Sequence, residues 1–583
     1  MMDEKQKKLL EDLLFEEKRK KPSLGKLLYS GLLETEHVFP YPKADPSEET
    51  AVNNLLNKLR SFCEKEIDPD GIDRRGDIPN TVIRGLGNMG ILGLTIPAEF
   101  GGLGMTQYAY CRAMEQLAGH CGSTALLVNA HQSVGLKALL LFGTEKQKAR
   151  WLRPLATGEM LAAFSLTEPN AGSDAAAIET KAEYDPQKKV YRINGMKQWT
   201  TNGSIAGFLT VMARTDEGGI TAFIVTPDMP GFKVAAPALE KVGYRGTRTS
   251  NLVFENLEVP EENILGTKGK GLRICLTVLD YGRTTFGATC TGVAKYLVRR
   301  AETYTVQRHQ FAQPLASFLL VKQKLAEMAA LAYAMDASTY LTAGLIDAGE
   351  EDIMLETAIL KVFASESLWK ITYDTMQLFG GRSFFSSEPF ERLMRDARIN
   401  MIGEGSNDVL RIFIAAVGLR EVGMKYKTLL QSMKNPSLTL RALSQFTGRL
   451  IGIFSKPEMP LRSPLLAPQA GRLCRSIRRF SFSVLRLLAK HREAVVEEQL
   501  KLNRIAESAI SLYTAVAVLS KIDSRLQSGN GKDFPSERET ETARFYCDFA
   551  LDKLDDSLKR LFTKNRDREI DALSDILTGA GVS

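Results

Sequence analysis

Glu404 stands between two glycines in the segment Met401–Asp408, which reads Met-Ile-Gly-Glu-Gly-Ser-Asn-Asp. A charged run, 390–398, precedes this segment, and an apolar run typical of a helix, 409–415, follows it. Burial of a carboxylate raises its pKa and makes it a usable general base near neutral pH. A glutamate beside a helix start more commonly caps or solvates the first turn. The pattern gives a candidate base and leaves its role open.

A second candidate site is the loop Phe164–Asp174, which reads Phe-Ser-Leu-Thr-Glu-Pro-Asn-Ala-Gly-Ser-Asp. The hydroxyls of Thr167 and Ser173 and the backbone N–H groups near Gly172 could hold a pyrophosphate or the edge of a flavin ring. The same residue types also make an ordinary β-turn. Further on, the segment 197–203 places the indole of Trp199 and two hydroxyls at the expected end of a strand, where Trp199 could equally be a core aromatic.

Gly85, Gly87 and Gly90 match the spacing of a dinucleotide-binding loop. That loop needs a preceding strand, whereas residues 81–84 read as the end of a helix, so we expect these glycines to stop the helix instead. The five histidines and seven cysteines contain no metal-ligand spacing. We therefore expect reduced thiols and no metal site.

The elements that must position these residues change in type along the chain. An N-terminal extension, 1–45, is followed by helical periodicity over 46–160 and by strand-like alternation over 161–270. Helical periodicity returns over 271–425, and a proline-rich linker with a last helical region fills 426–583. We expect a mainly α protein with a central β domain rather than the βαβ alternation of a doubly wound sheet.

Local signals add detail to this order. Asn194-Gly195 between two strand-like runs predicts a hairpin turn. Two prolines in Val38–Pro42 predict an extended path. We assign the prolines of the linker as Pro436, Pro457, Pro460, Pro464 and Pro468. A buried helical stripe is predicted at Leu502, Ile505, Ala509, Leu512, Val516 and Leu519.

The net charge of +7 is concentrated in Leu461–Arg492, which carries eight basic residues and no acidic one. Apolar residues between them would let this segment lie on an anionic membrane, and the alternative is a solvated helix face or a loop that contacts its own protein. Nucleic acid binding has no supporting motif. No uninterrupted apolar run reaches the ~18 residues of a membrane span. Acidic residues in the first 21 positions argue against a secretory or mitochondrial leader. We expect a cytoplasmic protein whose basic segment would allow membrane association, or a mitochondrial protein if a presequence has been removed.

Together, the two candidate loops, the β domain and the Glu404 turn resemble the acyl-CoA dehydrogenase family over about residues 46–425. The segment 38–42 and the helical region after 425 resemble its very-long-chain branch. The resemblance implies a helical domain, a β-barrel-like domain and a helical bundle, plus an appended C-terminal helical domain. It also implies FAD bound between the middle and C-terminal domains and across a subunit interface.

The resemblance implies a role for each matched position. Glu404 would be the catalytic base, since relatives that keep the base on the earlier helix carry it where this chain has Gly282. Ser173, Asp280 and Arg283 would bind substrate. The segments 308–311 and 377–381 would reach the FAD of a partner subunit. The implied cofactor contacts are Phe164, Leu166, Thr167, Gly172, Ser173, Trp199, Thr201, Arg308, Gln310, Phe311, Gln377, Gly380, Gly381, Ser406 and Asp408.

The implied reaction is the α,β-dehydrogenation of a long-chain acyl-CoA to the trans-2-enoyl-CoA, the first step of fatty acid β-oxidation. Glu404 would take the pro-R Cα proton, a hydride would pass from Cβ to flavin N5, and an electron-transfer flavoprotein would receive the electrons. Ala130, on the expected helix Ser123–Gly135, favours a deep pocket and a long acyl chain. The branch implies a homodimer, and the basic segment a peripheral membrane contact. Two alternatives are an assembly factor of a respiratory complex with secondary dehydrogenase activity, and an acyl-CoA oxidase.

Overall fold

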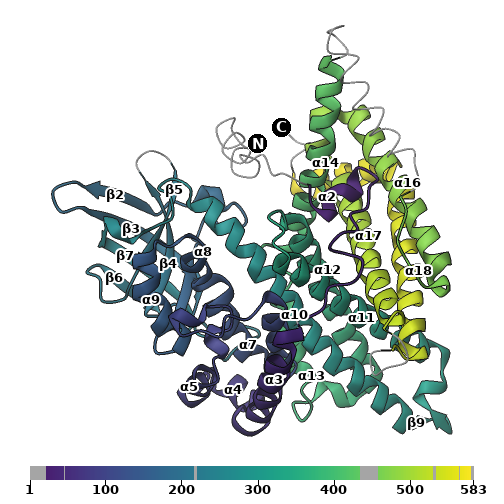
Figure 1. The fold of residues 1–583 in the computed structure, drawn as a ribbon, viewed down its shortest axis with the longest axis horizontal. Coiled ribbons are helices and arrows are strands. Elements are labelled where there is room, and N and C mark those ends of the chain that lie inside the picture. The colour runs from purple at the N-terminus through teal and green to yellow at the C-terminus, as the bar shows by residue number, and fades with distance from the viewer. Residues whose placement is uncertain are drawn as a thin grey trace. The chain divides into compact units, whose positions relative to one another are not determined.

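The computed structural model divides the chain into two compact units, which we describe separately (Figure 1). The first unit comprises residues 43–357 and 364–406, and the second comprises 21–42, 358–363 and 407–583. Every predicted site residue except Asp408 lies in the first unit. The residues that the structure describes are 22–44, 46–215, 219–432, 457–528, 534–563 and 565–579.

The first unit begins with short helices joined by glycine turns. In α3, Leu55 and Leu59 lie about one turn apart and are both buried. Gly101 and Gly104 take positive φ angles between η2 and α6. The helices of this part are α3 (Pro46–Glu66), α4 (Pro69–Arg75), α5 (Asn80–Asn88), α6 (Gln107–Ala118), α7 (Gly122–Asn129), α8 (Lys137–Phe142) and α9 (Glu145–Thr157), and η2 spans Ala98–Phe100.

The glycines that have the spacing of a dinucleotide-binding loop instead allow helices to pack closely. Gly85 and Gly87 lie inside α5, where an added Cβ would meet the Phe62 ring and the Thr157 carbonyl oxygen, each at 2.4 Å. Gly90 follows the helix with a φ of 77°. Only Gly90 therefore acts as the predicted stop, and the other two permit close approach of neighbouring elements.

A π-helical turn, η3 (Ala130–Gly135), interrupts the helical stretch between α7 and α8. Gly135 lets this turn approach the sheet, since a Cβ there would lie 2.8 Å from the Ala162 Cβ. π-turns of this kind occur frequently at functional sites.

Two helical stretches, Gly122–Phe142 and α17 (Gln499–Leu526), are long and apolar enough to cross a bilayer. In the structure, 72% and 89% of their most apolar windows are buried inside the protein. Both stretches therefore serve as core helices.

The central β domain is an eight-stranded sheet with the order β6-β7-β3-β2-β4-β5-β8, in which β1 pairs with β4 in parallel. Residues of β4 and β5 are buried on both faces, and one face packs on α9 and on the start of α10. The predicted architecture, mainly α with a central β domain, is confirmed (Figure 1). The strands are β1 (Ala162–Ser165), β2 (Lys181–Asp185), β3 (Val190–Thr201), β4 (Phe208–Thr215), β5 (Ile220–Val225), β6 (Phe232–Ala236), β7 (Thr249–Pro260) and β8 (Ile264–Leu265).

The predicted hairpin at Asn194-Gly195 is wrong. These residues lie inside the single strand β3, at a shift in its pairing with β7. A Cβ at 195 would lie 2.5 Å from the Thr180 hydroxyl, so glycine allows the neighbouring chain to pass closely. The Asn194 side-chain oxygen accepts a 2.7 Å hydrogen bond from the N–H of Asn256. Asn-Gly thus marks a bulge, for which the same residue types are suited.

Long helices complete the first unit. The helix α10, of 37 residues, packs against α6, α7 and α11 (Figure 1). Its burial along most of its length makes it the main support of the site described below. These helices are α10 (Gly271–Gln307), α11 (Leu319–Asp347), α12 (Met354–Phe379) and α13 (Phe390–Ile399).

In the second unit, α17 is the central helix, and the stripe predicted from Leu502 to Leu519 is buried. Pro464 begins η8 and Pro468 lies in the first turn of α16, so both belong to helix starts rather than to the predicted linker. Pro436 lies outside the described residues. The elements are α2 (Leu24–Tyr29), α14 (Asn407–Ser432), η8 (Pro464–Leu466), α16 (Ala467–His491), α17 (Gln499–Leu526), α18 (Glu537–Arg560) and α19 (Asn565–Thr578).

The basic segment forms α16 and packs on its own unit. Arg472 and Arg479 bond to Asp555 of α18, and Arg486 lies over the Phe562 ring at 4.1 Å. The apolar side of the helix is buried in the unit; it comprises Leu473, Ile477, Phe480, Val484, Leu487 and Leu488. The structure thus favours the second of the two readings given above.

The described part of the N-terminal extension packs into the second unit. Leu28 and Tyr29 of α2 are fully buried, and the Tyr29 hydroxyl donates to the Ile414 carbonyl oxygen at 2.9 Å. The N–H groups of Val38 and Phe39 bond to the Thr35 carbonyl oxygen, which makes a turn where an extended path is predicted. Val38 is fully buried, its carbonyl oxygen accepts from the Ser520 hydroxyl, and the Tyr41 N–H donates to the Ser524 hydroxyl, so contacts with α17 hold this turn against the local preference of the prolines.

Candidate active site

Glu404 lies in the turn between α13 and α14 in a backbone conformation that is rare for its residue type. Its φ is 56°, and that of Gly405 is 94°. The N–H groups of Ile402 and Gly403 bond to the Ile399 carbonyl oxygen, which continues α13 into this turn. A left-handed conformation costs a residue with a side chain about 1–3 kcal/mol, and such strain concentrates at functional sites.

The Glu404 carboxylate is aimed at α7 and α10. Its Oε1 accepts a hydrogen bond of 3.2 Å from the side-chain amide of Asn129. A Cβ built on Gly282 would lie 3.4 Å from its Oε2 and 3.0 Å from Cγ1 of Val134. Positions 282 and 404 therefore converge on one point in space, although 122 positions separate them in the sequence.

Asp280 and Arg283, on either side of Gly282, form an ion pair inside the protein. Arg283 Nη1 lies 3.1 Å from Asp280 Oδ1, and both side chains are largely buried. The Thr357 hydroxyl donates to the same carboxylate oxygen at 2.9 Å. The pair fixes this turn of α10 beside Glu404.

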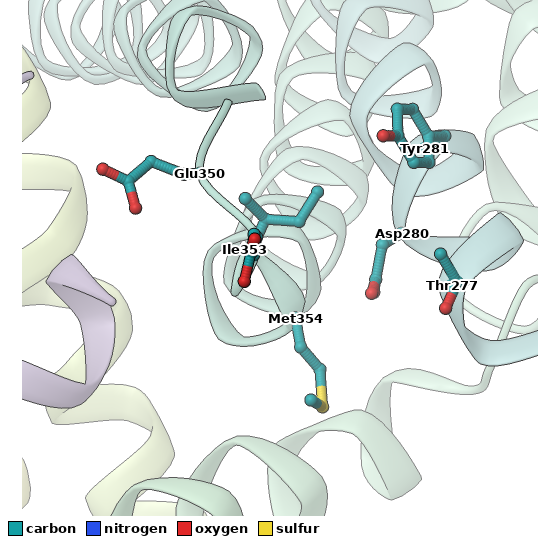
Figure 2. A pocket seen from close by; sticks show the side chains of 7 residues that line it. Thr277, Asp280, Tyr281, Glu350, Ile353 and Met354 are labelled. Atoms are coloured by element: carbon teal, nitrogen blue, oxygen red, sulfur yellow. The ribbon is translucent and has the colours of Figure 1, made fainter. Parts of the chain in front are cut away.

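A pocket opens next to Asp280 (Figure 2). Thr277, Asp280 and Tyr281 come from α10, and Met354 begins α12. Burial raises the pKa of Tyr281, so its hydroxyl stays neutral in the physiological range. The complete lining is Thr277, Asp280, Tyr281, Glu350, Glu351, Ile353 and Met354.

The loop after β1 and the end of β3 form one surface, which we call the platform and define as residues 164–173 and 197–201. The N–H of Gln198 donates to the Thr167 carbonyl oxygen at 2.8 Å. The hydroxyls of Ser165 and Thr200 lie 2.9 Å apart. The structure therefore brings the predicted residues Phe164, Leu166 and Thr167 beside Trp199 and Thr201.

The platform presents an aromatic ring and polar groups to the outside. Trp199 is 63% exposed, with a φ of 57°, so the sequence alternative of a core aromatic is wrong. Gly172 and Ser173 are exposed, and no atom lies within 4 Å of a Cβ built on Gly172. An exposed indole beside hydroxyls and an open glycine backbone suits a ligand with a flat ring and a pyrophosphate, so these residues fit FAD.

The platform and Glu404 meet through α7. The Asn202 side chain, next to Thr201, donates to the Leu127 carbonyl oxygen at 3.1 Å. Two residues further along the same helix, Asn129 contacts Glu404. The platform and the carboxylate are thus attached to one turn of α7 within the first unit.

A buried ion pair that the sequence did not reveal lies under the platform. Lys197 Nζ is 2.6 Å from Glu168 Oε1, and the two side chains are 0% and 3% exposed. Lys197 also donates to the Leu166 carbonyl oxygen at 3.0 Å, and Glu168 accepts the N–H groups of Glu179 and Thr180. Burial acts to raise the pKa of Glu168, but Lys197 and these N–H groups outweigh it and hold the pKa below its usual value.

The other predicted cofactor residues gather elsewhere on the first unit. Tyr304, one turn before Arg308, stacks on Phe379, which precedes Gly380, with ring centroids 4.0 Å apart. Phe311 is 88% exposed with a φ of 53°. Arg308, Gln310, Gln377, Gly380 and Gly381 are exposed as well. Within the described residues, no hydrogen bond or ion pair joins this group to the platform.

Ser406 and Asp408 flank the start of α14. Ser406 is half-buried directly before the helix, and Asp408 is exposed in its first turn. Asp408 belongs to the second unit. The structure therefore groups Ser406 with Glu404 and leaves Asp408 at the surface.

Two buried titratable groups support the site without being exposed in it. Burial lowers the pKa of His131 in η3 to about 4, so the neutral ring accepts from the Ala162 N–H and bonds to the Leu92 carbonyl oxygen. Burial raises the pKa of Asp396 to about 6, and this carboxyl accepts the N–H of Tyr244. Both hold neighbouring segments in place.

Sequence reasoning missed Asn129, Lys197 and Glu168. It also missed Thr285, whose hydroxyl donates to the side-chain oxygen of Asn129. Asn129 stands in the apolar run 125–130, where a single amide is an available signal for a buried polar role. Lys197 and Glu168 lie within the two quoted loops, but nothing in a sequence pairs residues 29 positions apart. No group of three or more histidine, cysteine or acidic residues is placed to hold a metal in the described part of the chain.

Comparisons with family models cover most of the chain. The models described as Acyl-CoA dehydrogenase N-terminal, middle and C-terminal domain match residues 50–159, 163–257 and 269–419. The model described as ACAD9/ACADV, C-terminal domain, matches residues 464–579.

Individual proteins match over similar lengths. The human mitochondrial very long-chain specific acyl-CoA dehydrogenase is 35% identical over 533 residues, which cover 88% of this chain and 81% of that protein. The probable acyl-CoA dehydrogenase FadE10 of Mycobacterium tuberculosis is 32% identical, over 96% of this chain and 89% of that protein. A solved acyl-CoA dehydrogenase complexed with FAD, from Bacillus anthracis, is 28% identical with a TM-score of 0.79 and covers 94% of both chains.

Proposed function

The chain belongs to the acyl-CoA dehydrogenase family, and on that premise we propose that it converts long-chain acyl-CoA to trans-2-enoyl-CoA with Glu404 as base. FAD is the cofactor of this family. The observation that carries the proposal is the position of the Glu404 carboxylate, 3.2 Å from Asn129 on the helix that also holds the end of the platform.

The thioester carbonyl makes the Cα proton of the substrate weakly acidic, so a positioned carboxylate is needed to remove it. The strained turn at Glu404 aims this carboxylate at the space bordered by Gly282. Glycine at 282 leaves that space to the substrate, whereas any side chain there would crowd the base. Bound FAD supplies the acceptor for the hydride that leaves Cβ.

For the cofactor, we propose contacts from the platform residues Phe164, Leu166, Thr167, Gly172, Ser173, Trp199 and Thr201. Trp199 would cover the ring system, and Ser173 with the backbone near Gly172 would bond to phosphate oxygens. The exposure of Trp199 supports this assignment, because burying a large aromatic in the protein core would otherwise be favourable.

We propose that the exposed second group, Arg308, Gln310, Phe311, Gln377, Gly380 and Gly381, contacts the FAD of a partner subunit in a homodimer. The exposure of the Arg308 guanidinium and of the glycine backbone supports this, since both offer donors to an anion from outside the unit. Ser406 and Asp408, near the start of α14, complete the proposed contacts. The apolar side of α16 is buried, so that side of the helix is not available to a membrane.

For the substrate, we propose that Ser173, Asp280 and Arg283 border the thioester and pantetheine part. The pocket that Asp280 lines together with Thr277 and Tyr281 of α10 supports this placement of Asp280 (Figure 2). Ala130, the first residue of the π-turn η3, is small, and we propose that this favours a long acyl chain. We propose an electron-transfer flavoprotein as the electron acceptor.

The test is steady-state turnover of Glu404→Gln with palmitoyl-CoA and an artificial electron acceptor. Glu404→Gln should retain FAD and lose turnover by about a hundredfold or more, as expected when a general base is removed. The matched control is Glu99→Gln, at an exposed glutamate of η2, which should keep wild-type turnover. Peroxide formed at the turnover rate without an acceptor would indicate an oxidase instead. Substantial turnover of Glu404→Gln would overturn the assignment of the base.

A further inference from the structure

We propose that Asn129 is a positioning residue for the base, and that a file of buried hydroxyls sets the orientation of its amide. This inference rests on the proposed role of Glu404 and extends it to residues on four other elements. Asn129 ends α7, Ser133 lies in η3, Thr285 lies in α10 and Tyr110 lies in α6. All four side chains are buried.

The contact between Asn129 and Glu404 fixes which side of the amide faces the carboxylate. Asn129 Nδ2 lies 3.2 Å from Glu404 Oε1, and Asn129 Oδ1 lies 2.5 Å from the Thr285 hydroxyl oxygen. If the amide were turned over, its oxygen would face an acceptor-only carboxylate and two oxygens would repel. The amide nitrogen therefore donates to Glu404, and the Thr285 hydroxyl donates to the amide oxygen.

This assignment determines every other donor in the file. A hydroxyl has one proton, and the Thr285 hydroxyl faces the Gly282 carbonyl oxygen at 3.0 Å as well as the Asn129 oxygen at 2.5 Å. Because the amide oxygen has no proton of its own, the short contact requires the Thr285 proton to go to Asn129. The Ser133 hydroxyl, 2.8 Å from Thr285, must then donate to Thr285. The Tyr110 hydroxyl, 2.8 Å from Ser133, donates in turn to Ser133. All bonds point the same way, from Tyr110 to the carboxylate, so each strengthens the next.

The π-turn explains how these side chains meet. Asn129 is the last residue of α7, and the wider turn η3 then carries Ser133 toward α10. The neutral ring of His131 ties this turn to β1 through the Ala162 N–H at 2.8 Å. The four side chains stand on helices, which hold side chains in place more precisely than loops do.

A neutral amide is a suitable partner for a catalytic base. A hydrogen bond from an amide stabilises the charged carboxylate and fixes its direction, while a cation in the same place would weaken its basicity far more. The nearby Arg283 is already paired with Asp280. The Asn129 amide thus favours the charged form of Glu404 and fixes its direction without placing a countercharge beside it.

Other titratable groups near Glu404 bear on the test. Tyr110 of α6 and Tyr244, before β7, have pKa values raised by burial, so both stay neutral in the range of an enzyme assay. Asp396 of α13, which bonds to the Tyr244 N–H, has a pKa raised by burial to about 6 and titrates in that range. Asp280 and Arg283 remain paired. These groups are the same in wild type and in each variant below, so a difference between the pH profiles reports the effect of the substitution.

The experiment compares Asn129→Leu, Thr285→Val and the conservative Thr285→Ser with wild type. The rate of flavin reduction by palmitoyl-CoA is followed across pH in single turnovers. Loss of a hydrogen bond to a charged group should move the acid limb of the pH–rate profile of Asn129→Leu upward by about 1–2 pH units. The half-saturating substrate concentration should change less than the limiting rate of flavin reduction. Thr285→Val should shift the limb in the same direction by less, and Thr285→Ser should restore the wild-type limb.

A second readout does not depend on turnover. Infrared difference spectra of wild type minus Glu404→Gln isolate the Glu404 carboxyl band, and its titration midpoint should rise in Asn129→Leu and Thr285→Val. If Asn129→Leu fails to fold, the two Thr285 variants decide the question, since Val and Ser differ in the hydroxyl. Coincident limbs and midpoints in wild type and the variants would overturn this inference. Full turnover of Glu404→Gln would instead overturn the proposed function, so the two failures are distinguishable.

Discussion

The buried pair of Lys197 and Glu168 should control both the stability of the β domain and the affinity for FAD. The pair is almost fully removed from solvent, with 2.6 Å between its charged atoms. Replacing Lys197 by Met leaves the Glu168 charge buried with only the backbone N–H groups of Glu179 and Thr180 as donors. Breaking a buried pair in this way costs about 3–5 kcal/mol of unfolding free energy.

The double variant Lys197→Met with Glu168→Gln separates charge from packing. The amide oxygen of Gln can still accept the two N–H groups, and no unpaired charge remains. We expect the double variant to recover more than half of the loss, because replacing a whole buried pair by neutral groups is often close to neutral. Lys197→Met alone should also weaken FAD binding, since Lys197 holds the Leu166 carbonyl at the start of the platform.

The assay is thermal unfolding of the FAD-loaded protein, with FAD release measured by fluorescence in the same samples. Lys233→Met is the control, since this lysine pairs with Glu255 on the exposed surface of the β domain and contributes little. Equal melting temperatures of Lys197→Met and wild type would refute the reasoning. A double variant as unstable as the single one would refute it as well.

Three further outcomes follow from the site. His131→Gln removes a group that stays neutral in the fold down to about pH 4, whereas an unfolded histidine binds a proton near 6.5. Wild-type stability relative to this variant should therefore fall by about 3 kcal/mol as the pH drops from 7 to 4, as measured by denaturant unfolding, and a constant difference would contradict it. Gly282→Ala places a methyl group 3.0 Å from Val134 and 3.4 Å from the base, so flavin reduction should slow by roughly tenfold with FAD retained, and an unchanged rate would contradict this. Palmitoyl-CoA should be oxidised faster than butyryl-CoA in steady-state assays, and the reverse order would contradict the long-chain assignment.

The sequence was most informative where residue type alone constrains the backbone. The change from helical to alternating periodicity near residue 161 predicted the β domain, because side chains that alternate between faces leave a period of two. The glycines around Glu404 predicted a turn, and Gly405 does take a positive φ. Constraints of this kind act between neighbouring residues, so they apply in the folded chain as they do in the sequence.

It was least informative where distant segments meet. Asn194-Gly195 predicts a hairpin locally, but the approach of Thr180 requires a bulge there, which no local pattern reveals. Asn129 reads as one polar residue in an apolar helix until α10 brings Thr285 and the turn brings Glu404 to it. The bond pattern that orients the base depends on four elements, so only the folded chain contains it.

The most direct measurement is an anaerobic absorbance titration of the purified, FAD-loaded protein with palmitoyl-CoA, run in parallel on wild type and Glu404→Gln. Wild type should lose its oxidised-flavin absorbance on adding one equivalent of substrate, while Glu404→Gln should bind the same substrate and keep that absorbance. Equal bleaching of the two proteins would contradict the assignment of Glu404 as the base. A protein that binds no FAD after reconstitution would contradict the platform as its site.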